Sequence, residues 1–308
     1  MSYSSYIVRR TLGLIPKLLI ASVVVFMLVQ ITPGDPVTTL APPRASPEQL
    51  AALRDKWRLN EPLYIQYLTW MANLLQGDLG LSAATRRPVT EMIALRVPIS
   101  LRFSALALFI SYAIAIPFGI IGAVKQHTSW DYLSMGFVLL AISFPSFWFA
   151  ILLILVFAIQ LGWTSAVGYG TVGLLVLPAV ALGLRGSAIE TRVMRSSMIE
   201  TLNEKFITAS RAHGLPERSV IFKHALRNAL IPIITLFGLR LGYILASGLV
   251  IEIVFNRPGV GHLLVDSIFK RDYPVVRAIL MILVTTIMLG NFLADLLYGL
   301  ADPRIRYD

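Results

Sequence analysis

Long apolar stretches limit what this chain of 308 residues can fold into more than any other feature. The hydrocarbon core of a bilayer is about 30 Å thick, so a helix needs roughly 20 apolar residues to cross it. Hydrophobic residues make up 56% of the chain and charged residues only 14%, which is far from the averages of soluble domains. The chain is therefore predicted to be an all-α integral membrane protein.

Six stretches are long enough to form transmembrane helices. They are residues 11–31, 99–124, 132–160, 172–195, 228–251 and 276–300. The first is expected to be a retained helix rather than a cleaved signal peptide, because its apolar run is long and no A-x-A-like site follows it. The fourth is the least apolar, so its charged residues Arg185 and Glu190 must face protein or water.

The positions of Lys and Arg predict the orientation, because short loops rich in these residues stay in the cytoplasm. With the N-terminus inside, twelve Lys and Arg fall on the cytoplasmic side, and three, Arg257, Lys270 and Arg271, fall in short external loops. Both termini are therefore predicted to be cytoplasmic. The predicted segments are an N-terminal segment with the first helix (1–31), an external loop (32–98), a core with five helices (99–300) that includes a cytoplasmic loop (196–227), and a cytoplasmic tail (301–308).

The external loop contains two predicted short helices. Ser46 is a candidate N-cap with Pro47 at the first helical position and Glu48 in the first turn, which predicts a helix after residue 46. A second helix is predicted over residues 62–75. Its aromatic residues suit either the membrane interface or a docking surface for a soluble partner, and they are Tyr64, Tyr67 and Trp70.

Motifs for chemistry are missing from the sequence. It contains no phosphate-binding loop, no H-E-x-x-H, no G-x-S-x-G and no glycine-rich dinucleotide turn. There are no cysteines, and the four histidines lack metal-ligand spacing. The net charge of +10 is assigned to cytoplasmic loops rather than to nucleic-acid binding. The chain is therefore not expected to be an enzyme or to hold a cofactor or a metal.

A basic segment, residues 206–232, lies between two apolar stretches and is predicted to form a cytoplasmic knob. Ala209 and Ala212 have small side chains that a partner groove can approach closely, and Gly214 frees the backbone to turn. Arg211 can pair with acidic groups at the rim of such a groove. The alternative is a positively charged loop that rests on anionic lipid.

Arg240 is the most informative charge within a span, because ionisable residues in a bilayer are costly and usually face a cavity or a partner. We expect it to line a translocation path and to attract a carboxylate of a peptide-like substrate, with an internal salt bridge to Asp295 or Glu190 as the alternative. Pro145 and Ser146, in the third span, are further candidates for the path. Pro145 is also a candidate hinge, as are Pro117 and Pro178, because proline removes a helical hydrogen bond.

Sequence motifs along nearly the whole chain resemble the membrane subunits of ATP-binding-cassette (ABC) importers. FITASRAHG (206–214) resembles their E-A-A-x-x-x-G loop, although Thr208 and Ser210 replace Glu and Ala, His213 stands where Lys is usual, and the later proline is delayed to Pro232. The other matching pieces look like the branch that imports dipeptides, oligopeptides, glutathione or nickel. They are ITPGDP (31–36), ISFPSFW (142–148), RSSMIETL (195–202), HALRNALIPIIT (224–235), VIEIVFNRPGVGHLLVDSI (250–268) and LADLLYGLADPRIRY (293–307).

The resemblance implies the fold of type I ABC importer permeases and a coupling helix seated in an ATPase subunit. The residues implied for coupling are Thr208, Ala209, Ser210, Arg211, Ala212, His213, Gly214 and Leu215. It also implies that an external gate or a docking surface for a substrate-binding protein is formed around Glu252, Pro258, Gly259, Gly261 and Asp266.

The partners implied are a second homologous permease, usually a different chain, two ATPases that bind ATP and Mg, and an extracytoplasmic binding protein. The location implied is the bacterial cytoplasmic (inner) membrane. Two alternatives to an ABC importer of peptides remain. One is an ion-coupled secondary transporter, which should show acidic residues at mid-membrane, and the other is an ABC importer of nickel or another non-peptide solute. An integral membrane enzyme is disfavoured because no convergent cluster of His, Asp or Ser is apparent.

Overall fold

The computed structural model describes residues 3–31, 46–56, 60–165 and 172–301, and these are almost entirely helical. Within these ranges, β-structure is limited to an isolated bridge between Leu81 and Pro88. Four helices are long and apolar enough to cross a membrane, and two bent helix pairs raise this number to six. The predicted tail beyond residue 301 and the ITPGDP motif after Ile31 lie outside the described residues.

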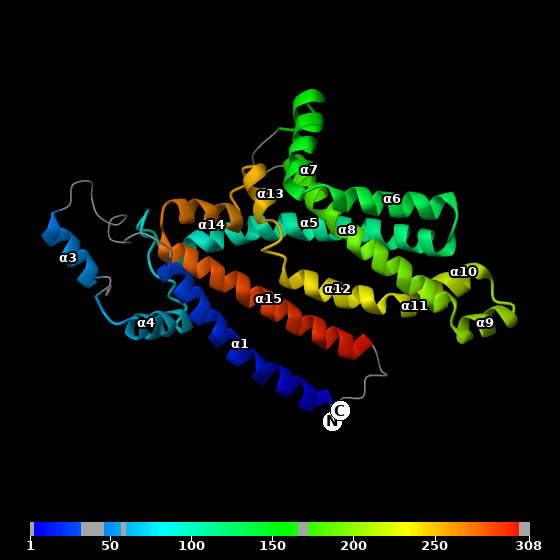
Figure 1. Cartoon of the computed structure of the whole chain (residues 1–308), viewed down its shortest axis with the longest axis horizontal. Coiled ribbons are helices and arrows are strands. Elements are labelled where there is room, and N and C mark those ends of the chain that lie inside the picture. Colours follow the sequence, from blue (N-terminus) through cyan, green and yellow to red (C-terminus); the bar gives the residue numbers. More distant parts are fainter. Residues whose placement is uncertain (1–2, 32–45, 57–59, 166–171, 302–308) are drawn as a thin grey trace.

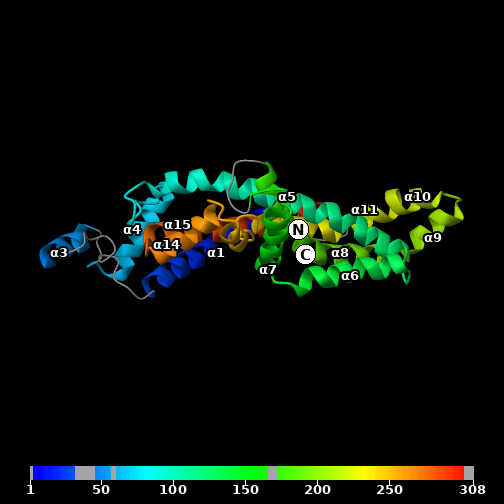
Figure 2. The ribbon, with the colours of Figure 1, turned by 90° about the horizontal axis from the view of Figure 1, so that it is seen from above.

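The long helices form an elongated bundle (Figures 1 and 2). The four unbroken spans are α1 (Tyr3–Ile31), α5 (Val89–Val124), α8 (Val172–Leu202) and α15 (Tyr273–Ala301). Helices α5 and α8 pack along each other, and α15 packs against α1 on one side and against α12 (Ile231–Gly242) on the other. Glycines allow the last approach, since a Cβ on Gly238 would collide with the backbone of α15, and a Cβ on Gly290 of α15 would collide with the backbone of Gly242. Arg10 and Asp295 form an ion pair of 2.8 Å between α1 and α15.

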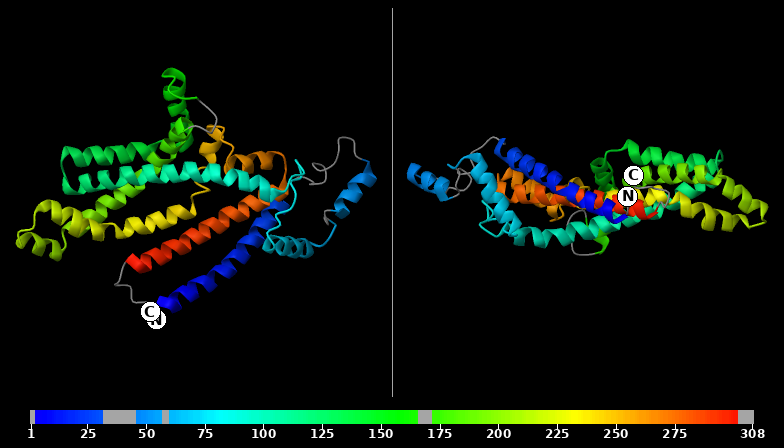
Figure 3. Two further views of the ribbon diagram at one scale, coloured as in Figure 1. Left: turned by 180° about the vertical axis from the view of Figure 1, so that it is seen from behind. Right: turned by 90° about the horizontal axis from the view of Figure 1, so that it is seen from below.

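The third predicted span, 132–160, is not one straight helix. Helix α6 (Ser129–Ser143) and the helical run formed by α7 (Ser146–Leu153) and η1 (Ile154–Gln160) meet at an angle of 100°, and α7 stands away from the bundle in Figure 3. Phe144 has extended backbone angles and Pro145 follows it. A residue before proline is kept out of the helical region, so α6 ends there.

The fifth predicted span, 228–251, is also interrupted. Helix α11 (Leu226–Ala229) follows η2 (Val220–Ala225) and meets α12 at a bend of 47°. Helix α12 ends at Gly242, a run of turns occupies residues 243–248, and α13 (Leu249–Val254) begins beyond it. The sequence prediction of a continuous helix is wrong here, because it counted apolar residues and did not consider where the backbone turns.

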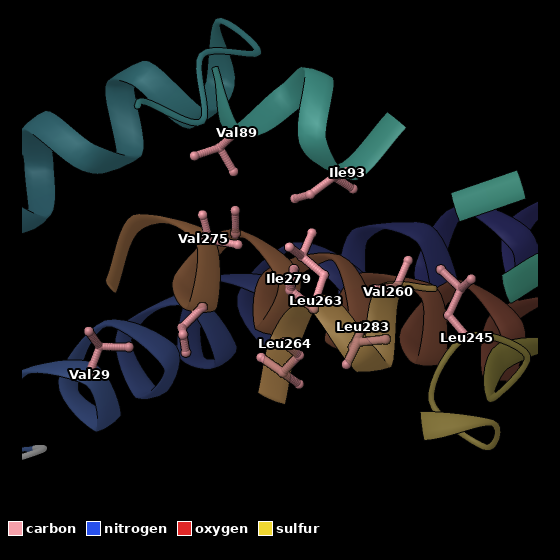
Figure 4. Packing of buried hydrophobic residues seen from close by; sticks show 12 residues of the cluster. Val29, Val89, Ile93, Leu245, Val260, Leu263, Leu264, Val275, Ile279 and Leu283 are labelled. Atoms are coloured by element: carbon pink, nitrogen blue, oxygen red, sulfur yellow. The ribbon is translucent and has the colours of Figure 1, made fainter. Parts of the chain in front are cut away.

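An apolar cluster closes one end of the bundle, where α1, α5, α14 (Val260–Phe269) and α15 meet (Figure 4). Val29, Val89, Leu263 and Ile279 are among its buried side chains. Burying such a side chain stabilises the fold by about 1.5–3 kcal/mol, so this end of the bundle is firmly packed.

The two short helices predicted in the external loop are present. Helix α3 (Pro47–Lys56) begins with a reciprocal cap, in which Gln49 N donates to Ser46 Oγ and Ser46 N donates to Gln49 Oε1. Helix α4 (Leu63–Leu75) packs two of its aromatic side chains onto this chain's own first span: Tyr67 and Trp70 lie with ring centroids 5.5 and 5.9 Å from that of Phe26. Tyr64, by contrast, is exposed.

Candidate functional site

A central cavity of about 500 Å³ lies where α5, α8 and α12 meet beside the bend between α6 and α7. Its lining includes hydroxyl groups and three charged side chains within an otherwise apolar wall. The lining residues are Ser104, Ala107, Leu108, Ser111, Ile142, Ser146, Leu182, Gly183, Arg185, Gly186, Ile189, Glu190, Arg240, Ile244 and Ser247. Arg240 and Ser146, which the sequence analysis assigned to a path, are both on this wall, while Pro145 immediately precedes it.

Arg240 lines the cavity and also makes the ion pair that was considered as its alternative. Its Nε donates to Glu190 Oε1 at 2.9 Å, and Ser111 Oγ donates to the other oxygen of the same carboxylate. The Glu190 side chain is 1% exposed, whereas that of Arg240 is 34% exposed. The pair therefore fixes α12 to α8 and leaves the guanidinium far more accessible than the carboxylate. Asp295, the other partner considered, pairs with Arg10 instead.

Arg185 is a second cation on the cavity wall, in α8 and one turn and a half before Glu190. It lies about 17 Å along the helix from Leu174, where the apolar part of α8 begins, and thus near the middle of the span. The Arg185 side chain is exposed. If α8 crosses the membrane, this charge must face water or a partner protein. The sequence analysis noted this requirement but did not assign Arg185 to the path.

The predicted coupling segment lies at the far end of the molecule from α3 and α14, as a projection made of α9 (Lys205–Ala212) and α10 (Glu217–Ser219) (Figures 1 and 2). Seven of the eight residues from Thr208 to Leu215 are exposed, and Ser210 is half-buried. Gly214 follows the end of α9 with a φ of +76° and has no atom within 4 Å of an added Cβ. It supplies the left-handed conformation that ends a helix, as the sequence predicted.

Helix α9 is anchored to the bundle by one side chain. Ile207 is fully buried in a cluster with Met194 and Met198 of α8 and with Val220 of η2. Arg211, on the exposed face, donates from Nε and Nη2 to the Glu217 carboxylate at 3.1 and 2.7 Å, and this bond raises the pKa of Arg211. The projection is therefore a braced loop whose apolar anchor, Ile207, is buried in a cluster that it shares with α8, the helix that also lines the central cavity.

The turn between α13 and α14, which the sequence analysis predicts to be external, is organised around a buried carboxylate. Glu252 accepts hydrogen bonds from Ser100 Oγ at 2.5 Å and from Gly261 N at 2.8 Å, and Ser100 Oγ in turn accepts one from Val260 N. A Cβ on Gly259 would overlap the Glu252 side chain. Glu252, Gly259 and Gly261 are thus buried parts of a turn.

Burial therefore removes these three residues from any surface that a binding protein could touch in this conformation. Pro258 is half-buried. Asp266 is partly exposed and pairs with Lys270 at 2.8 Å, so it is the predicted docking residue that remains accessible. Asp272 was not singled out from the sequence, yet it holds the segment before α5 by accepting from Ser82 Oγ at 2.5 Å and Ala83 N at 2.9 Å. Its position directly before an apolar helix was the one signal available.

The family models that match this chain cover nearly all of it. Residues 115–307 match the model described as binding-protein-dependent transport system inner membrane component, and residues 3–104 match the N-terminal model of the same membrane component.

Curated relatives match over the whole chain as well. The oligopeptide transport system permease protein AppB of Bacillus subtilis is 39% identical over 99% of this chain and 100% of the relative. The glutathione transport system permease protein GsiC of Escherichia coli K12 is 40% identical over 98% of this chain and 99% of the relative.

Solved structures show the same fold at low sequence identity. A chain of the MetNI methionine ABC transporter in an inward-facing conformation superposes with a TM-score of 0.59 at 18% identity, over 68% of this chain and 96% of that chain. An amino acid ABC transporter gives a TM-score of 0.55 at 14% identity, over 68% and 94%. The predicted fold, that of type I ABC importer permeases, is thereby confirmed.

Proposed function

Because the chain belongs to the family of binding-protein-dependent transport system inner membrane components, we propose that it translocates peptide-type solutes across the cytoplasmic membrane by alternating access. The cargo class follows the names of the relatives, which are permeases for oligopeptides and glutathione. The alternative cargo is nickel or another non-peptide solute. Among the described residues, no group of three or more His, Asp or Glu could hold a metal ion.

The observation that carries the mechanism is the continuity of α8. Its Met194 and Met198 belong to the buried cluster that holds the anchor of α9, Ile207, and its Arg185 and Glu190 line the central cavity. Glu190 and Met198 are about 12 Å apart along the helix axis. A partner that displaces α9 therefore pushes on the same rigid element that forms the cavity wall, and a rigid-body movement of this kind can switch a cavity between two openings.

The partners that this mechanism requires are two ATPase subunits that bind ATP and Mg and receive the segment Thr208–Leu215. Ala209, Ala212 and Gly214 are exposed and small, so a groove of the ATPase can approach that segment closely. We further propose a second homologous permease of different sequence to complete the path, and an extracytoplasmic binding protein that delivers the solute. The chain itself then needs no nucleotide site.

An ion-coupled secondary transporter fits the geometry less well. Such a transporter needs a carboxylate that can gain and lose an ion at mid-membrane. Glu190 is the acidic residue lining the described cavity, and it is already engaged by Arg240 and Ser111. The engagement of Glu190 therefore favours transport that is driven by ATP hydrolysis in partner subunits over ion-coupled transport.

The test is ATP-dependent uptake by the whole complex in proteoliposomes, with Gly214→Asp as the variant. We expect uptake to be abolished while the complex still inserts and assembles, because the new side chain occupies the surface that enters the ATPase. Gly77→Asp is the matched control, since Gly77 has a φ of +79° and equally open surroundings but lies next to α4. Full uptake by Gly214→Asp, or uptake driven by an ion gradient without ATP, would contradict the proposal.

A further inference from the structure

The central cavity carries one more positive charge than its own carboxylate balances. Its charged lining residues are Arg185, Glu190 and Arg240. The Glu190 carboxylate forms an ion pair with Arg240 and accepts a hydrogen bond from Ser111. Within the described part of the chain no carboxylate lies at ion-pair distance from Arg185, although its side chain is exposed. A lone guanidinium at this depth is costly, so its presence calls for an anion that the chain itself does not supply.

Arg185 also lies on the boundary of a second, smaller cavity. This elbow cavity, of about 290 Å³, occupies the inside of the bend between α6 and α7 where it faces α8. Its walls are almost entirely apolar and include three phenylalanines, Phe137, Phe144 and Phe149. Arg185 and Ser146 are the residues that line both cavities. The cation is therefore placed between a polar space and an aromatic one.

We propose that Arg185 and the elbow cavity form a binding site for the solute in transit. The guanidinium of Arg185 receives a carboxylate of the solute, and the elbow cavity receives an apolar side chain next to that carboxylate. This inference rests on the proposed function and names the part of the cargo that the permease itself recognises. A peptide with a free C-terminal carboxylate and an apolar last residue carries both groups on one residue.

The chemistry of the two groups supports this pairing. The planar guanidinium binds a carboxylate through two parallel hydrogen bonds, and such charge-assisted bonds strengthen where water is scarce. Arg240 cannot take the same role as readily, because its Nε is already bound to Glu190. Aromatic walls suit an apolar or aromatic side chain, which gains by leaving water. Recognition therefore divides between one charged contact and one apolar contact.

The experiment uses the reconstituted complex with both permeases, the ATPases and the binding protein. The probes are alanyl-alanyl-phenylalanine with a free carboxylate and the same tripeptide as its C-terminal amide, each loaded on the binding protein. For wild type, Arg185→Gln and Arg185→Lys, we measure uptake of both peptides and the ATP hydrolysis that the loaded binding protein stimulates. Arg192→Gln is the matched control, because Arg192 is exposed on the same helix and lines neither cavity.

We expect Arg185→Gln to lower the ratio of acid to amide uptake about tenfold or more, as the loss of a charge-assisted contact predicts. Arg185→Lys should retain part of the ratio, Arg192→Gln should retain all of it, and stimulated ATP hydrolysis should persist in every variant. An unchanged ratio in Arg185→Gln overturns the inference. So does an equal loss for acid and amide together with lost ATP hydrolysis, which identifies Arg185 as a contact to a carboxylate of another subunit. If wild type takes up neither peptide with ATP, the proposed function fails and the inference fails with it.

Discussion

At the scale of single residues, the ion pair between Arg240 and Glu190 has two unequal partners. Glu190 is 1% exposed and Arg240 is 34% exposed towards the cavity. Removing one member of a buried pair leaves the other charge uncompensated, at a cost of about 3–5 kcal/mol when both are fully buried. Water in the cavity can screen a lone Arg240 far better than a lone Glu190.

We therefore predict that Arg240→Gln destabilises the complex more than Glu190→Gln. The expected losses are about 3 kcal/mol for Arg240→Gln, which leaves the buried carboxylate, and about 1 kcal/mol for Glu190→Gln. The double variant should be more stable than Arg240→Gln alone, since no charge is then left unpaired. Thermal unfolding of the detergent-solubilised complex gives the order, and a reversed order would show that the pair is not the one described.

The buried turn around Glu252 gives a second prediction. Gly259→Ala places a methyl group where the Glu252 carboxylate lies, so the hydrogen bonds from Ser100 and Gly261 must shift or break. A buried acceptor that loses its partners costs about 1–3 kcal/mol. Gly136→Ala, in α6, meets no atom within 4 Å and should instead stabilise its helix by about 0.5–1 kcal/mol. The apparent melting temperatures of the two variants should therefore move in opposite directions, and a fall of equal size in both would contradict this reading.

At the scale of elements, the bend at Pro145 shapes the elbow cavity and is open to direct measurement. Leu133 of α6 and Ile159 of η1 are both exposed, and a continuous helix would separate them by about 39 Å. With the observed bend of 100°, the separation falls to roughly 25 Å. The chain has no cysteine, so spin labels on Leu133→Cys and Ile159→Cys report this distance without background. A distribution centred near the longer value would exclude the bend.

The elements also show how much of the fold can be predicted from the sequence. The length of the apolar runs predicted the long helices, because a helix that crosses lipid must form all its backbone hydrogen bonds internally. The cap at Ser46 could be predicted because its hydrogen-bond partners are close in sequence. The bend before Ser146 was only partly foreseen. Pro145 was recognised as a hinge candidate, but an apolar run scores equally whether it is straight or bent. Residues 243–248, where the helix breaks, contain no proline, so this signal of a bend is missing from the sequence.

The parts of the site that depend on residues close in sequence could be predicted, and those that depend on contacts between distant helices could not. Gly214 was identified because a helix end with exposed small residues is a local pattern. Arg240 was identified as a charge at mid-membrane, but only the structure shows that Glu190 neutralises it, since that pairing joins helices 50 residues apart. The same pairing leaves Arg185 unbalanced, so its importance could not be seen before the helices were placed.

At the scale of the whole molecule, the orientation in the membrane remains a prediction based on loop charges. The first turns of α1 and the end of α15 lie together through the pair Arg10–Asp295, so whichever side holds one holds the other. Helix α9 and the α3–α4 region lie at opposite ends of the bundle (Figure 1). A single determination of which end faces the cytoplasm therefore orients the entire chain.

We predict that α9 faces the cytoplasm, because the Lys and Arg of short loops gather at that end. Single-cysteine variants of this cysteine-free chain can be labelled in intact bacterial cells with a maleimide that does not cross the membrane. Asp78→Cys, after α4, should be labelled directly. Lys205→Cys, at the exposed start of α9, should be labelled only after the cells are permeabilised. The wild-type chain gives the background. Labelling of Lys205→Cys in intact cells would invert the orientation and would remove α9 from the side on which ATP is available.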